Sequence, residues 1–128
     1  MGWIAALKQG APAFSNAEEV TVTGGETKFV DLNTPVTFLT QGTGTNFLKF
    51  GDPGKEAKGM AKSVVLVGFT SDTVQVGPVD DLSDDGTNLK TVVLNATGES
   101  CQWIWSGTKW SLIDVPTIGG VAAGTDLG

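Results

Sequence analysis

Short runs in which apolar and polar residues alternate dominate the middle of the chain. Residues 18–23 alternate in this way and end at Gly24-Gly25, a turn signal, and residues 27–31 follow as a predicted partner strand. Alternation with a period of two over such short lengths predicts strands with one buried face, and no stretch of helical period competes with it. The pattern therefore predicts an all-β protein of about eight short strands.

Two stretches refine this prediction. Residues 62–69 contain the continuous apolar run Val64-Val65-Leu66-Val67, which favours a central strand. Near the carboxyl end, Gly107-Thr108 has the Gly-X form of a type II′ turn, which joins adjacent antiparallel strands. The resulting register pairs Trp105 with Trp110. Alternation then places five residues on one face of this hairpin: Cys101, Trp103, Trp105, Trp110 and Leu112.

The length of 128 residues suits one domain. We expect residues 1–17 to form an amino-terminal arm, residues 18–116 a β-sandwich or jelly-roll-like domain, and residues 117–128 a Gly/Ala-rich tail. A small barrel is the architectural alternative. The 18 glycines suit a fold with many tight turns.

Composition narrows the range of functions. The formal net charge is −6, which disfavours a nucleic-acid partner because an acidic chain repels phosphates. There is no His, and all eight basic residues are Lys, so the commonest general base and the bidentate Arg clamp are both missing. We therefore expect no enzyme, no cofactor and no metal. No stretch approaches transmembrane length, and no membrane partner is expected.

The tryptophans of the hairpin allow two interpretations. Flat aromatic faces could form a sugar-binding platform, or Trp103, Trp105 and Trp110 could fill the core between two sheets. The apolar neighbours Cys101 and Leu112 on the same face favour a core aromatic cluster. Cys101, the sole cysteine, cannot form an intrachain disulfide and has no His partner to activate it.

Two charged loops are candidate ligand sites. The acidic loop Asp80–Asp85 could hold Ca²⁺, but alignment to an EF-hand loop puts Val92 where a bidentate Glu is needed, which favours a solvated turn. Lys55, Lys58 and Lys62 could bind phosphate, but they match no phosphate-binding motif. We expect these lysines to be surface charges or partners in salt bridges between subunits.

The two ends of the chain carry apolar residues without a local partner. Trp3 in the arm is a candidate anchor for a neighbouring subunit or for the chain's own domain. The candidate assembly residues are Trp3, Ile4, Leu7, Phe14, Val121 and Leu127.

Residues 36–115 resemble small bacteriophage virion proteins, including capsid decoration (cement) proteins and β-domains of tail spikes and fibres. The resemblance is carried by Val36–Leu39, Val64–Val67, Asp72–Val76, Thr91–Leu94 and, most specifically, the Trp-x-Gly-x-x-Trp segment that ends at Trp110. It implies a particle component, a homotrimer bound on a capsid surface, and it supplies no catalytic residues.

Three functions follow as hypotheses. The first is a decoration protein that bridges major capsid subunits or other virion proteins, is assembled in the host cytoplasm and resides on the virion. The second is a receptor- or glycan-binding module of a tail or capsid appendage, which requires an exposed Trp. The third, sugar hydrolysis, needs two carboxylates across a cleft, whereas Asp80–Asp85 are crowded into one loop.

Overall fold

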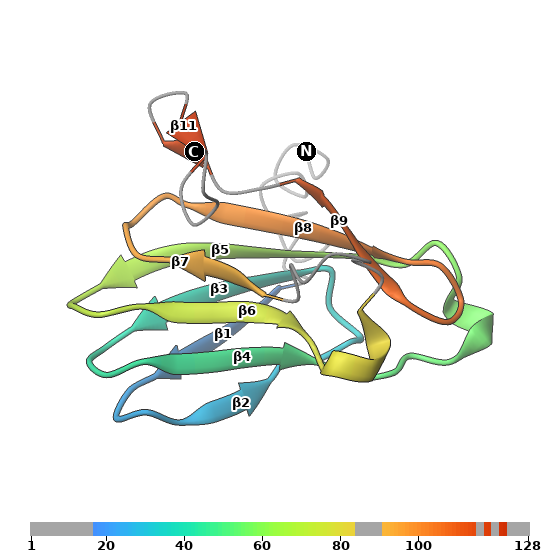
Figure 1. Cartoon of the computed structure of the whole chain (residues 1–128), viewed down its shortest axis with the longest axis horizontal. Helices are drawn as coiled ribbons and strands as arrows, with labels where there is room; N and C mark the ends of the chain where they lie inside the picture. Colours follow the sequence, from blue (N-terminus) through green and yellow to red (C-terminus); the bar gives the residue numbers. More distant parts are fainter. Residues whose placement is uncertain (1–16, 84–90, 115–116, 119–120, 123–128) are drawn as a thin grey trace, which may run out of the picture.

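Two β-sheets packed face to face form the body of the protein (Figure 1). The computed structural model describes residues 17–83 and 91–114, together with residues 117–118 and 121–122. The strands are β1 Ala17–Val22, β2 Thr27–Phe29, β3 Val36–Gln41, β4 Asn46–Phe50, β5 Ala61–Phe69, β6 Val74–Pro78, β7 Val92–Leu94, β8 Ser100–Trp105, β9 Trp110–Asp114, β10 Thr117–Ile118 and β11 Val121–Ala122. Two 3₁₀ turns are η1 Lys55–Ala57 and η2 Asp80–Leu82. The predicted all-β class and two-sheet sandwich are confirmed.

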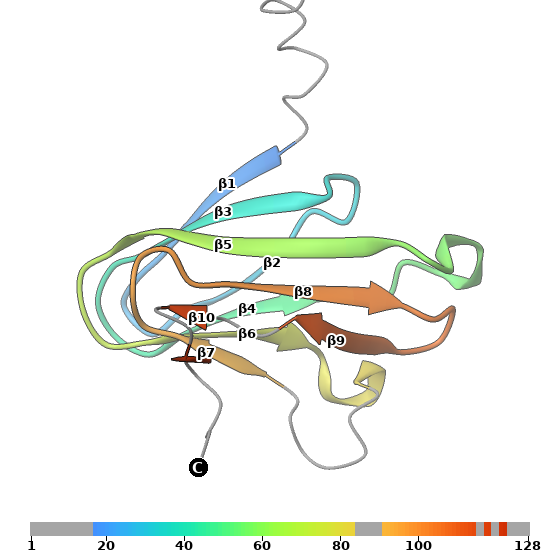
Figure 2. The ribbon, with the colours of Figure 1, turned by 90° about the horizontal axis from the view of Figure 1, so that it is seen from above.

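The chain alternates between the two sheets through its first six strands. β1, β3 and β5 lie side by side and parallel in a five-stranded sheet of order β1-β3-β5-β8-β9 (Figure 2). β2, β4 and β6 lie parallel in a four-stranded sheet of order β2-β4-β6-β7. Each pair of successive strands is thus one coil around a shared core. The last three strands pair antiparallel with their neighbours: β7 with β6, β8 with β5, and β9 with β8. This mixed connectivity differs from that of an antiparallel jelly roll.

The prediction that residues 27–31 pair with residues 18–23 was wrong, because β2 lies in the opposite sheet from β1. Gly24 and Gly25, both with positive φ, form a turn that crosses between layers instead of closing a hairpin. Its amides bond to the next coil: the Gly24 amide donates to the Thr43 carbonyl at 2.8 Å. The three such turns stack on one another at the left of Figure 1.

Two buried amide side chains join these stacked turns. Asn46 Oδ1 accepts from the amides of Gly25 and Glu26, both at 2.8 Å, and Asn46 Nδ2 donates to Gln41 Oε1 at 2.9 Å. Gln41 Nε2 then donates to the Ser71 carbonyl at 2.9 Å. Asn46 and Gln41 are both fully buried. They therefore satisfy polar groups of three successive coils at one end of the core.

Replacing Asn46 with Ala should lower the free energy of unfolding by about 2 kcal/mol, because a buried network loses its central donor and acceptor. Urea denaturation measures this loss. The matched variant Asn33→Ala changes an exposed turn residue, and we expect an effect within about 0.5 kcal/mol. Equal effects of the two variants would contradict the role assigned to Asn46.

The tryptophan cluster lies inside the sandwich. Trp103, Trp105 and Trp110 are each at most 1% exposed. Phe50 of the opposite sheet contacts Trp103 edge to face at 5.8 Å between ring centroids and Trp110 at 5.1 Å. The indole N–H groups of Trp105 and Trp110 donate to the carbonyls of Gly54 and Gly51. The cluster therefore joins the carboxyl-terminal hairpin to the opposite sheet and to the loop after β4.

The hairpin register is the predicted one, with Trp105 opposite Trp110 and Trp103 opposite Leu112. Two boundaries differ from the sequence prediction. β1 begins at Ala17, which had been assigned to the arm, and the predicted tail contains the antiparallel β10–β11 ribbon. Each of these two strands has only two residues, which is too short to show an alternation of apolar and polar positions. The hydrophobic pattern therefore does not predict the β10–β11 pairing.

Candidate functional site

The central strand of the five-stranded sheet is apolar on both of its faces. β5 occupies the middle position, as its continuous apolar run predicted. Val64 and Leu66 point inward and are fully buried, whereas Val67 is 47% exposed on the other side. Strands that are apolar on both faces are typical of sheets covered from both sides. In the part of the chain that the structure describes, the second side of this sheet has no covering layer.

This second side, called the outer face below, carries apolar residues on four strands. Phe38 is 38% exposed and Ile113 is 51% exposed. Phe38 lies directly opposite Val65 in the β3–β5 register, so the apolar positions of these two strands are contiguous, whereas Ser63 and Gln102 lie between them and Ile104 of β8. The apolar residues of the outer face are Val36, Phe38, Val65, Val67, Ile104 and Ile113.

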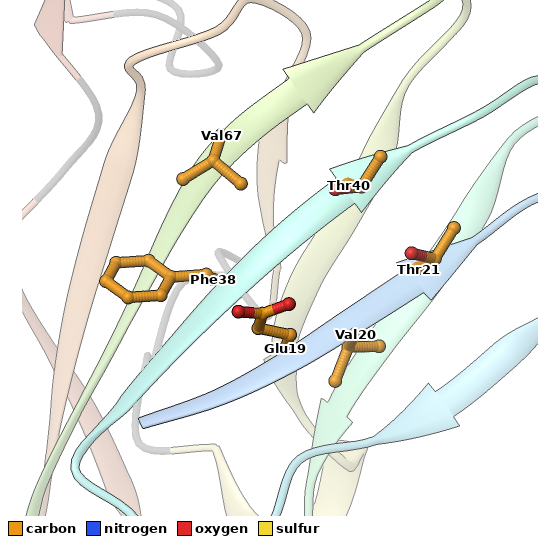
Figure 3. Close-up of a pocket in the computed structure, with 6 residues that line it drawn as sticks. All are labelled: Glu19, Val20, Thr21, Phe38, Thr40 and Val67. Carbon is orange, nitrogen blue, oxygen red and sulfur yellow. The ribbon is translucent and has the colours of Figure 1, made fainter. Parts of the chain in front are cut away.

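A shallow depression of about 260 Å³ lies at the β1 side of the outer face (Figure 3). Its lining residues come from three adjacent strands and are Glu19, Val20, Thr21, Phe38, Thr40 and Val67. A β-bulge shapes it, because Leu39 pairs with Leu66 but Thr40 pairs with Gly68, which leaves Val67 as the extra residue. A Cβ at Gly68 would lie 3.1 Å from Thr40 Cγ2, so glycine allows Thr40 to pack against β5 at this point.

The chemistry of the depression suits an apolar side chain with a basic neighbour. Phe38 and Val67 supply apolar walls, and Glu19 is the one charged group among the six lining residues. Glu19 forms no salt bridge with another described residue. The volume is below the roughly 300–1,000 Å³ of sites for drug-sized ligands. A single anchoring side chain from another segment therefore fits this depression better than a metabolite does.

Lys62 corrects one sequence prediction. Expected at the surface, it is only 1% exposed and points between the sheets. Its Nζ donates to the carbonyls of Asp31 and Thr34 at 2.8 and 2.7 Å and forms a salt bridge with Glu18 at 3.3 Å. Burial lowers the pKa of Lys62, and the nearby Glu18 and Asp31 partly offset this effect. The residue thus ties β1, the loop after β2 and β5 together, rather than a neighbouring subunit.

The remaining predicted positions fall into three groups. Lys55 and Lys58 are exposed at η1, as expected of surface charges, and Cys101 is buried in β8. The acidic loop begins in η2, and its positions 84 and 85 lie outside the described residues. Among the described residues, no group of three or more His, Cys, Asp or Glu side chains could hold a metal ion.

The assembly candidates cannot be placed in the fold. Five of them lie outside the described residues, namely Trp3, Ile4, Leu7, Phe14 and Leu127. For Val121 the structure describes the strand β11 but not the side chain.

The sequence interpretation missed the outer face. The sequence pattern identifies Phe38 and Val67 only as strand residues, because alternation alone does not say which side of a strand faces solvent. One signal was present: a continuous apolar run such as Val64–Val67 predicts that both faces of the strand need cover.

Among the described residues, no helix is both long and apolar enough to span a membrane. Comparison of the chain with protein-family models, with curated proteins and with solved structures finds no match.

Proposed function

We propose that this protein is a structural component of a bacteriophage particle, a decoration protein that assembles as a homo-oligomer and bridges major capsid subunits. The observation that carries the proposal is the outer face. An apolar sheet surface without a covering layer is a typical contact surface for another protein. The sequence resemblance of residues 36–115 to small virion proteins is the reason for proposing a phage particle as the assembly.

The burial of the tryptophans supports assembly over glycan recognition. A sugar platform requires flat aromatic faces open to solvent, whereas Trp103, Trp105 and Trp110 are at most 1% exposed. Phe38 is more accessible, but it lies among aliphatic side chains and beside only two Thr hydroxyls and one carboxylate. A pyranose ring needs a denser set of hydrogen-bond partners than this face supplies.

The variant Phe38→Lys should reduce incorporation into particles at least about tenfold, because it removes an aromatic ring from the apolar surface and places an ammonium group directly opposite Glu19 in the β1–β3 register, where it pairs with that carboxylate. The measurement is co-sedimentation of purified protein with particles of the source phage that lack it. The matched control is Phe29→Lys. Phe29 is 57% exposed on β2 of the other sheet, against 38% for Phe38, so its substitution tests an exposed aromatic away from the outer face.

Thermal unfolding of both variants verifies that they remain folded. Absence of the wild-type protein from particles would contradict the proposed function. Equal incorporation of Phe38→Lys and wild type would contradict the assignment of that function to the outer face.

A further inference from the structure

The depression on the outer face has the size of one side chain, and the chain itself carries a segment of matching chemistry. We propose that residues 1–16 of a second copy of this chain dock on the outer face, with Trp3 in the depression beside Glu19. This inference rests on the proposed function, since it names the contact through which copies assemble. It assigns a binding role to Glu19, Phe38 and Val67, and it identifies the partner as the same protein.

Composition supports this pairing. Residues 1–16 contain Trp3, Ile4, Leu7 and Phe14, one Lys at position 8 and no acidic residue. The outer face presents an apolar surface, and the one charge in its depression is the carboxylate of Glu19. Trp is enriched among residues that dominate interface energies, where it fills a pocket of side-chain size. Lys8 is the one cation of this segment, and Glu19 has no salt-bridge partner among the described residues.

The direction of β1 favours a second copy over the chain's own domain. β1 starts at Ala17, opposite Val36, and the depression is lined by Glu19, Val20 and Thr21 farther along the strand. The chain that precedes Ala17 therefore meets the sheet at the end away from Thr21, about 13 Å from it at roughly 3.3 Å per residue. Docking in the same molecule would require residues 4–16 to turn back over their own sheet, whereas an arm that docks on a neighbour can continue away from its own sheet along the direction of β1.

The length of the segment is sufficient. Sixteen residues span at most about 55 Å when extended. The five-stranded sheet is about 19 Å wide at roughly 4.8 Å per strand spacing. A segment of this length can leave its own sheet and cross the outer face of an adjacent copy.

Tryptophan fluorescence of the full chain tests the inference, because the other three tryptophans are at most 1% exposed. We expect wild type to be oligomeric by light scattering and poorly quenched by acrylamide. Phe38→Lys should be monomeric, with about one quarter of its emission newly quenchable, since Trp3 is one of four tryptophans. Trp3→Ala should also be monomeric, and Phe29→Lys should behave as wild type.

Mixing separates exchange between copies from docking within one chain. Trp3→Ala has an intact outer face, and Phe38→Lys has an intact arm. Their mixture should form hetero-oligomers in which the quenchable emission of Phe38→Lys is lost again. A wild-type monomer with protected Trp3, a wild type with fully quenchable Trp3, or a mixture that stays monomeric would each overturn the inference.

The particle assay distinguishes this inference from the proposed function. Oligomers in which residues 1–16 dock on a neighbouring copy, but which never join particles, would contradict the proposed function and leave this inference standing. Particle-bound protein whose Trp3 is quenched by acrylamide would contradict this inference and leave the proposed function standing.

Discussion

Replacing Trp110 with Ala is expected to lower the free energy of unfolding by about 3–5 kcal/mol, the usual cost of deleting a large buried aromatic side chain. Trp110 is fully buried and packs against Phe50 at 5.1 Å and Trp105 at 5.4 Å between ring centroids. Its deletion opens a cavity between the two sheets and leaves the Gly51 carbonyl without its indole donor. Since small domains have only about 5–15 kcal/mol of stability, this loss should be visible as a large shift of the urea midpoint.

Two controls accompany this prediction. Ile113→Ala lies in the same strand but on the outer face, where Ile113 is 51% exposed, and we expect an effect within about 0.5 kcal/mol. Trp110→Phe retains an aromatic ring without the N–H group, so its loss should lie between those two values. A loss below about 1 kcal/mol for Trp110→Ala would show that the cluster is not part of the stabilising core.

Replacing Lys62 with Met should lower the free energy of unfolding by about 3 kcal/mol, at the lower end of the cost of breaking a buried ion pair. Lys62 Nζ is the donor for the carbonyls of Asp31 and Thr34, which the methionine thioether cannot replace. Glu18 keeps its charge but loses its cation, and its side chain is 18% exposed, so water screens part of that loss. Chemical denaturation measures the difference, and Lys58→Met, at an exposed position, should be close to neutral.

The pH dependence of this difference provides a second readout. Burial holds the pKa of Lys62 below its ordinary value of 10.5 in the folded protein. Between the lowered pKa and 10.5 the unfolded chain binds more protons than the folded one, so folded stability rises with pH in that window. The advantage of wild type over Lys62→Met should therefore grow as the pH approaches 10.5 from below. A difference that stays constant with pH would mean that burial does not shift the pKa of Lys62.

Local patterns predicted the carboxyl-terminal hairpin well. Its register depends on Gly107, which adopts a positive φ, and on alternation over the strands that flank this turn. Both determinants lie within a few residues of each other. The inward position of Trp105 and Trp110 then follows, because one face of the hairpin is much more apolar than the other.

The layer assignment of β2 and the burial of Lys62 could not be predicted in this way. Gly24-Gly25 is equally compatible with a hairpin and with a turn that crosses to another sheet. The outcome is decided by Asn46, some 20 residues away, which bonds the amides of this turn. Lys62 lies at an inward-facing position of β5, but a Lys side chain is expected to be exposed unless its buried partners are known. Those partners come from β1 and from the loop after β2.

By itself, the sequence determined the all-β class, the central position of β5 and the hairpin with its aromatic side, since each depends on periodicity or turn chemistry within one short segment. Only the tertiary structure decided the parallel coils, the ion pair of Lys62 and Glu18, and the exposure of Phe38 and Val67. These features arise between segments far apart in the chain. Alternation states that a strand has two faces, but which face is covered depends on the layers that pack against it.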